Sequence, residues 1–201
     1  MTKQSHSYNK IAAFVLLTRY DECSMSSYYN KQIFIPTVTE TGKITGEIER
    51  WEAHKKGILH KAFSVALFID HQIVLQIRKH PVFDGIIDVT ASSHPEMKEG
   101  KMEDEKVGVL NCLKREWHIE ENQITNLHDA GSIYYRANDP KSDFIEHEYC
   151  TFYVGKIEKM VSPDPEFAYG YSLVDLEFLK KNPQSFNLAP WVVEVLNKKL
   201  F

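Results

Sequence analysis

The sequence predicts a mixed α/β or α+β fold, and three observations support this prediction. Hydrophobic residues make up 43% and charged residues 26% of the 201 residues, the balance of a globular chain with a sizeable core. Short apolar stretches with turn residues between them indicate strands and hairpins. Amphipathic stretches between and after them indicate helices. We expect an N-terminal extension over residues 1–30 and one domain over residues 31–201.

Paired strands are expected in the first half of the domain. Residues 32–40 and 44–51 flank Thr41-Gly42-Lys43, which is typical of a hairpin turn. Residues 62–70 and 73–78 form a second predicted pair with a tight turn between them.

The middle of the chain predicts a short strand followed by a helix. Residues 85–91 are a short apolar run, and residues 98–106 are nearly all charged. After them Val107, Leu110, Leu113 and Trp117 recur at spacings of three, three and four, the period of an amphipathic helix.

The last third predicts two strands and two closing helices. Residues 131–136 and 149–157 read as strands, and residues 173–181 and 189–200 as amphipathic helices. Pro183 and Pro190 mark the boundary between these helices.

Charge and cysteine content exclude several classes of function. A net charge of −4 and a pI near 6.1 predict neither a nucleic-acid partner nor a membrane partner. Cys23, Cys112 and Cys150 are too dispersed for a disulfide framework, so we expect a reducing, cytoplasmic location. The apolar run at residues 11–17 is far shorter than the roughly 20 residues of a membrane span. Charged residues follow it and no small-residue cleavage site appears, so we expect a packed segment rather than a signal peptide.

Histidines and carboxylates form a candidate metal site. His54, His60 and His94 recur beside strand-like segments, and Glu146 and Glu148 are two residues apart at the start of a strand. Residues two apart on a strand share a face. Three imidazoles and two carboxylates suit Mn, Zn or Fe(II). Surface histidines and histidines satisfied in the core are the alternative interpretation.

Several segments together resemble one known family. They are residues 57–68 (GILHKAFSVALF), 73–78 (IVLQIR), 92–95 (SSHP), 134–140 (YYRANDP), 146–150 (EHEYC) and 189–193 (APWVV). In order and rough spacing they resemble the type I isopentenyl diphosphate isomerases of the Nudix superfamily, from about residue 33 to the C-terminus. The resemblance implies a Nudix-type α/β/α sandwich with a mixed sheet. It also implies a role in isoprenoid biosynthesis, through a metal-dependent 1,3-proton shift between isopentenyl and dimethylallyl diphosphate.

The resemblance also implies roles for individual residues. One divalent ion, Mn or Zn, would be held by a set of five residues: His54, His60, His94, Glu146 and Glu148. Glu116 would serve a second ion, Mg, that accompanies the diphosphate. Arg50 and Arg78 would bind the diphosphate, and guanidinium groups suit phosphate oxygens. Catalysis would use Glu148 with Tyr135 on one side of the alkene, beside an aromatic wall at Trp191 that suits a carbocation. For Glu116, Arg50, Arg78 and Trp191, an ordinary surface or core role stays an open alternative.

The sequence departs from the family at the second catalytic group. The family's Cys-x-His-Pro is Ser92-Ser93-His94-Pro95 here, and an alcohol lacks the acid–base range of a thiol. A diphosphate-binding lysine before Gly85 has no counterpart, and Cys112 stands where the family has a basic residue. We therefore expect Ser92 to occupy the catalytic position and isomerisation to be weak or altered.

Two other functions stay open for this sequence. A Nudix hydrolase acting on a nucleoside-type or prenyl-type diphosphate needs clustered carboxylates around Mg. With Glu116 aligned as the final glutamate, Glu103 is kept, but Met97 replaces the glycine and Cys112 and Arg115 replace two carboxylates. The third candidate is a non-catalytic relative that binds a diphosphate. We expect a small-molecule partner and a monomer or dimer.

Overall fold

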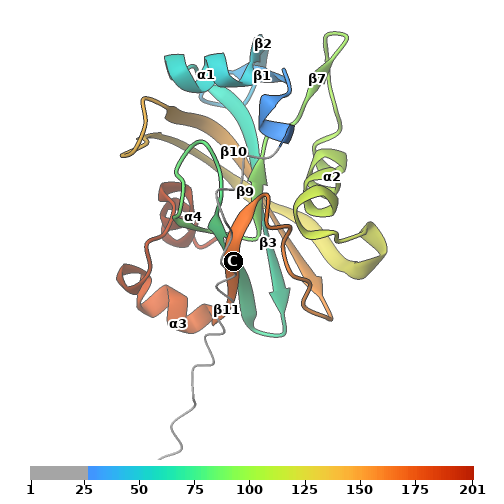
Figure 1. Cartoon of the computed structure of the whole chain (residues 1–201), viewed down its shortest axis with the longest axis vertical. Helices are drawn as coiled ribbons and strands as arrows, with labels where there is room; N and C mark the ends of the chain where they lie inside the picture. The colour runs from blue at the N-terminus through green and yellow to red at the C-terminus, as the bar shows by residue number, and fades with distance from the viewer. Residues whose placement is uncertain (1–26) are drawn as a thin grey trace, which may run out of the picture.

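A mixed β-sheet runs through the molecule, with helices on both faces (Figure 1). The computed structural model describes residues 27–201. The main sheet is built from β1 (Phe34–Val38), β2 (Ile44–Glu49), β3 (His60–Ile69), β4 (Gln72–Arg78), β5 (Ile87–Asp88), β6 (Ala91–Ser93), β9 (Ile124–Asn138), β10 (Ile145–Ile157) and β11 (Ala168–Asp175). β10 lies parallel to β3 and antiparallel to β9, while the other pairings are antiparallel.

Four α-helices and three short 3-10 turns complete the described chain. The helices are α1 (Arg50–Lys56), α2 (Glu105–Trp117), α3 (Leu176–Lys181) and α4 (Pro190–Lys198). The turns are η1 (Ser27–Asn30), η2 (Glu121–Gln123) and η3 (Pro183–Ser185). A separate hairpin joins β7 (Met97–Lys98) to β8 (Lys101–Met102).

The core consists of two apolar layers on opposite faces of the sheet. Side chains of β3 alternate between the layers, because successive residues of a strand point to opposite faces. Phe63, Val65 and Leu67 contact the α2 side, where Leu113 and Trp117 are buried. The other layer includes Ala62, Ala66 and Phe68 with residues of α3 and α4. Figure 1 shows α2 on one side of the sheet and α3 and α4 on the other, the predicted sandwich.

Most predicted elements are confirmed. The 41–43 turn joins β1 to β2, and Asp70 adopts a positive φ of 52° in the tight turn between β3 and β4. Glu146 and Glu148 lie within β10, which begins at Ile145, so the premise of their shared face holds. β9 and β10 extend well beyond the predicted residues 131–136 and 149–157.

Three predictions of secondary structure were wrong in part. The predicted strand 44–51 ends at Glu49, whose carboxylate caps the start of α1 by accepting from the Glu52 N–H. The charged stretch 98–106, for which no element was predicted, contains the last residue of β7, the whole of β8 and the start of α2. The run 85–91 divides into β5 and the start of β6. The predicted helix 173–181 begins only at Leu176, because the preceding residues pair with β4 as β11.

The N-terminal extension is described only from Ser27. The packed segment predicted at residues 11–17 and Cys23 both lie outside the described residues. Within residues 27–201, none of the helices combines the length and the apolar character needed to cross a membrane.

Candidate metal centre and pocket

Strand register brings the predicted ligands together. β10 pairs in parallel with β3 so that Glu148 lies opposite His60, at the first residue of β3. Glu146 is two residues earlier on β10 and shares that face. α1 ends at Lys56, and the capping residue Gly57 has a φ of 60°, which lets the chain reverse. This turn places His54 near His60. His94 follows β6, which pairs with β3 from the other side.

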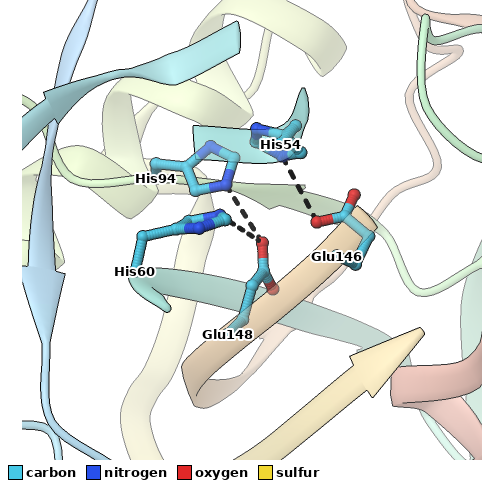
Figure 2. Close-up of side chains that lie close together, drawn as sticks. All are labelled: His54, His60, His94, Glu146 and Glu148. Carbon is cyan, nitrogen blue, oxygen red and sulfur yellow. Dashed lines mark hydrogen bonds and ion pairs between the residues drawn. The ribbon is translucent and has the colours of Figure 1, made fainter. Parts of the chain in front are cut away.

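The five side chains converge on one point (Figure 2). One ligand atom from each residue lies within 4.8 Å of those of the others. His54 Nε2 is 3.3 Å from Glu146 Oε2, and Glu148 Oε1 is 3.0 Å from His94 Nε2 and 3.5 Å from His60 Nε2. Four of the five residues are buried, and the side chain of the fifth, His94, is 11% exposed.

Backbone carbonyls fix the orientation of two of the imidazoles. His54 Nδ1 lies 2.7 Å from the Arg50 carbonyl, and His60 Nδ1 lies 2.7 Å from the Ile58 carbonyl. A carbonyl only accepts, so each Nδ1 carries the proton when the ring is neutral. Each Nε2 then presents its lone pair to the centre of the cluster, as a metal ligand must.

Unsatisfied polar atoms show that this donor set fits a divalent cation. Three buried atoms lack a hydrogen-bond partner among the described residues: His54 Nε2, His60 Nε2 and Glu146 Oε2. A carboxylate oxygen nevertheless lies near each imidazole, Glu146 Oε2 near His54 and Glu148 Oε1 near His60. Buried polar atoms rarely stay unpaired without a ligand or a functional reason. Three imidazoles and two carboxylates fit Mn, Zn or Fe(II). We therefore conclude that these residues can hold one divalent ion.

Charges within the cluster oppose the effect of burial. Burial would lower the pKa of His54, but the Glu146 carboxylate raises it above its usual value. Burial and the neighbouring His60 and His54 lower the pKa of His94 well below its usual value. Burial would raise the pKa of Glu148, but the nearby His60 imidazole lowers it below its usual value. Glu148 is thus held as a carboxylate.

A tyrosine connects the cluster to the adjoining pocket. Tyr135 on β9 lies opposite Glu148 in the β9–β10 register, and its hydroxyl donates a hydrogen bond to Glu148 Oε2. Burial and the Glu148 charge raise the pKa of Tyr135 well above its usual value, so the phenol keeps its proton. The pair therefore holds one proton between a phenol and a carboxylate.

Every predicted site residue lies in the cluster or in the wall of one pocket. The predicted residues that line the pocket are Arg50, Arg78, Ser92, His94, Glu116, Tyr135, Glu146, Glu148 and Trp191. His54 and His60 belong to the cluster. The pocket is polar near the metal centre and has Trp191 in its wall, 5.7 Å between ring centres from Tyr135.

The 3-10 turn η1 forms part of the pocket wall, which the sequence did not predict. Tyr28 and Tyr29 line it, and the free volume is about 20 Å³, room for little more than one water molecule. The Tyr29 carbonyl accepts from Trp51 Nε1 at 2.8 Å, and the Tyr29 hydroxyl donates to the Lys79 carbonyl at 3.3 Å.

Arg50 has no carboxylate partner among its hydrogen bonds. Its Nη2 lies 3.3, 3.4 and 3.5 Å from the carbonyls of Tyr28, Tyr29 and Lys31, and its buried Nε is unpaired. Arg50 is 3% exposed, and burial lowers the pKa of its guanidinium. A buried cation bound only to neutral oxygens is a suitable anion site.

The other predicted charges already have partners. Glu116 Oε1 accepts from Arg115 at 2.8 Å and from the Cys112 thiol at 3.3 Å, and Glu116 lies outside the five-residue cluster. Arg78 donates to Asp88 at 2.7 Å. Binding roles for Glu116 and Arg78 stay predictions.

Sequence reasoning missed five residues of the pocket wall and one carboxylate behind it: Tyr28, Tyr29, Phe63, His80 and Ser93, and Asp88. The one sequence signal among them was Asp88, a single acid inside the apolar run 85–91. The tyrosines lie in a polar extension that gave no indication of contact with the site.

Similarities to known proteins agree with this geometry. No family model matches the chain. The chain is 31% identical over 163 residues to Isopentenyl-diphosphate Delta-isomerase 1 of Mesocricetus auratus, covering 73% of this chain and 70% of the relative. It is 28% identical over 184 residues to Isopentenyl-diphosphate Delta-isomerase of Streptomyces coelicolor, covering 87% of each. The solved structure of DR0079 from Deinococcus radiodurans aligns with a TM-score of 0.62 at 14% identity, covering 82% of this chain and 98% of that one. The last likeness confirms the fold.

Proposed function

The chain belongs to the isopentenyl-diphosphate Delta-isomerase family, and from this premise we propose that it interconverts isopentenyl and dimethylallyl diphosphate. The observation that carries the proposal is the His54, His60, His94, Glu146 and Glu148 cluster, joined through Glu148 to the Tyr135 hydroxyl in a pocket with an aromatic wall. We propose that Arg50 binds the diphosphate, with Arg78 beside it.

In this reaction a proton adds to the terminal carbon of the alkene, and another leaves the methylene on the diphosphate side of the branched carbon. The proton shared by Tyr135 and Glu148 is the one proposed to add. The tertiary cation that results would face Trp191, whose ring attracts positive charge. Ser92 lines the same pocket, and its hydroxyl is the group proposed to face the departing proton. Transfer of that proton to the Ser92 oxygen would form the new double bond. The substrate thus gains one proton and loses one, and exchange with solvent would take the proton from Ser92 and restore the one on the Tyr135–Glu148 pair.

A divalent ion, when bound, would supply positive charge that holds the Glu148 carboxylate in place. The ligands proposed for it are the five cluster residues. Mg²⁺ accompanying the diphosphate, with Glu116 as its ligand, stays part of the proposal. A cytoplasmic location is also proposed, in keeping with Cys112 and Cys150, which are free thiols.

The hydrolase alternative has less support from the α2 helix. Hydrolases of this superfamily need clustered carboxylates around Mg, whereas Glu116 is paired with Arg115 and touches Cys112. Glu103 accepts from the Glu96 N–H at 2.9 Å instead of joining Glu116. Isomerisation is therefore the better-supported activity.

The proposal is tested with the full chain, Mn²⁺ and Mg²⁺, and isopentenyl diphosphate in deuterated water. Nuclear magnetic resonance should show dimethylallyl diphosphate carrying deuterium. The Glu148→Gln variant should lose this activity, while Glu47→Gln, an exposed carboxylate of β2, should keep it. Release of phosphate or pyrophosphate without isomerisation would instead establish the hydrolase, and ligand binding without either reaction would establish a binding relative.

A further inference from the structure

A second guanidinium lies directly behind the pocket wall, on α2. The side chain of Arg115 is 23% exposed, and its Nη2 donates to Glu116 Oε1 at 2.8 Å. Glu116 itself lines the pocket. The same Nη2 lies 3.3 Å from the Sγ of Cys112, a buried residue of the same helix. These contacts hold the head group of Arg115 against the pocket wall.

One aromatic ring connects Arg115 with Arg50. The Arg115 guanidinium lies 4.0 Å from the centre of the Tyr28 ring, and the Arg50 guanidinium lies 4.9 Å from the same centre. The two cations are therefore separated by no more than the sum of these distances. Tyr28 lines the pocket, so its ring is the part of the wall that lies against both guanidiniums. The ring attracts each cation but carries no charge that could neutralise it.

The two guanidiniums around this ring retain unused hydrogen-bond donors. Glu116 neutralises Arg115 through Nη2, whereas Arg50 donates only to backbone carbonyls. The Nε atoms of both arginines are buried and have no hydrogen-bond partner among residues 27–201. Buried donors rarely stay unpaired without a ligand or a functional reason. A guanidinium offers N–H groups in a fixed fork that matches phosphate oxygens, so the missing partner is an anion of this kind.

We propose that Arg115 is a second diphosphate-binding residue, and that Arg50 and Arg115 each bind one phosphate group of the substrate once the Tyr28 ring turns aside. Arg115 keeps its contact with Glu116 through Nη2 and offers Nε to the phosphate. The inference deepens the proposed function and rests on it for the identity of the substrate. It favours a diphosphate over a monophosphate, because two separate guanidiniums match two phosphate groups.

The binding test uses isopentyl diphosphate, a saturated analogue that cannot isomerise, and isopentyl phosphate, with Mn²⁺ and Mg²⁺ present. In calorimetry, Arg115→Gln should weaken binding of the diphosphate about ten- to a hundredfold, because a hydrogen bond to a charged group is lost. Binding of the monophosphate should weaken much less, since Arg50 is still present. The matched control is Lys114→Gln, the same change of charge at an exposed neighbour that pairs with Glu120 at 2.9 Å. It should leave both affinities unchanged. Equal losses for the two ligands, or no loss, would overturn the proposal.

A double variant separates contact with the ligand from support of the Tyr28 ring. In the Tyr28→Ala background, Arg115→Gln should still weaken binding of isopentyl diphosphate by about the same factor, because the guanidinium contacts the ligand itself. If Arg115 acted only by holding the ring, the substitution would have no further effect in this background, and the proposal would be refuted. Arg115→Lys keeps the charge beside Glu116 but loses the fork, so it should recover part of the affinity. It also replaces Arg115→Gln in both tests if that variant does not fold.

Kinetics with isopentenyl diphosphate distinguish this inference from the proposed function. Arg115→Gln should raise KM and leave kcat nearly unchanged, because the contact is made equally in the ground state and the transition state. A loss confined to kcat would overturn the inference, as would failure of the unmodified chain to bind isopentyl diphosphate. If the unmodified chain bound the analogue, with the expected loss in Arg115→Gln, but did not isomerise isopentenyl diphosphate, the proposed function alone would fail.

Discussion

Replacing His60 by leucine should separate the stability of the fold from the binding of metal. His60 Nε2 is buried without a hydrogen-bond partner, and His60 Nδ1 is bonded to the Ile58 carbonyl. An unsatisfied buried polar atom costs about 1–3 kcal/mol, and a hydrogen bond contributes about 1 kcal/mol. The variant removes both. We expect the free energy of unfolding of metal-free His60→Leu to equal that of the unmodified chain or exceed it by about 1–2 kcal/mol.

Metal should reverse this order. With Mn²⁺ at a hundredfold excess over its Kd, the unmodified chain should gain about 2.7 kcal/mol. For a chain of this size that gain corresponds to a rise in Tm of about 5–11 °C. His60→Leu should show a much smaller rise, because one of five ligands is missing. A chelator should return both proteins to their metal-free values.

Thermal unfolding followed by circular dichroism, with and without Mn²⁺, measures both effects. His80→Leu is the matched control, because His80 is also a largely buried histidine of the pocket wall but lies outside the cluster. It should keep the full metal response. Equal metal-induced shifts in His60→Leu and the unmodified chain would refute the five-ligand centre, as would a metal-free His60→Leu that is several kcal/mol less stable.

Three further predictions concern catalysis, pH and access. Ser92→Cys should raise kcat for isopentenyl diphosphate, within the roughly 10²–10⁴-fold range of general acid–base assistance, while KM stays high. The control is Ser93→Cys. No gain in kcat relative to this control would mean that the pocket serves another substrate. Burial lowers the pKa of His80 well below 6.5, so at acidic pH the unfolded chain binds a proton that the folded chain does not. The free energy of unfolding should therefore fall by up to about 1.4 kcal/mol per pH unit as the pH drops below 6.5. In urea unfolding, His80→Leu should show a shallower fall with pH, and an unchanged slope would contradict the assignment to His80. Tyr28→Ala should open the pocket and increase the association rate of pyrophosphate in stopped-flow measurements. Adding Arg50→Gln to this variant should weaken the binding of pyrophosphate at least about tenfold. An unchanged association rate in Tyr28→Ala would show that η1 does not limit entry.

The sequence by itself determined the elements whose signal is local. The hairpin at Gly42, the apolar run of β3 and the helical period of α2 depend on neighbouring residues, so each was predictable. The ligand set was also readable, because His54, His60, His94, Glu146 and Glu148 are residue types that metals require, and a family resemblance placed them together.

Tertiary structure decided the elements whose local signal was weak. α1 is one helix of seven residues, mostly polar and following directly on a strand, so its period was too short to recognise. The start of the predicted helix at 173 became β11, because hydrogen bonds to the exposed edge of β4 outweighed helical propensity. The charged stretch after residue 97 forms part of the β7–β8 hairpin. Because this stretch lacks the alternation of apolar and polar residues that indicates a strand, the sequence did not predict the hairpin.

The geometry of the site depends on contacts between residues far apart in the chain. Glu148 meets His60 only because β10 pairs in parallel with β3 in one register, and a shift of one residue would turn Glu148 to the other face. The position of Tyr28 in the pocket wall and the pairing of Arg78 with Asp88 likewise arise from packing. The sequence alone determines the residue types and the local periodicity of apolar residues. The strand register and the partners of buried charges are determined only when the whole sheet forms.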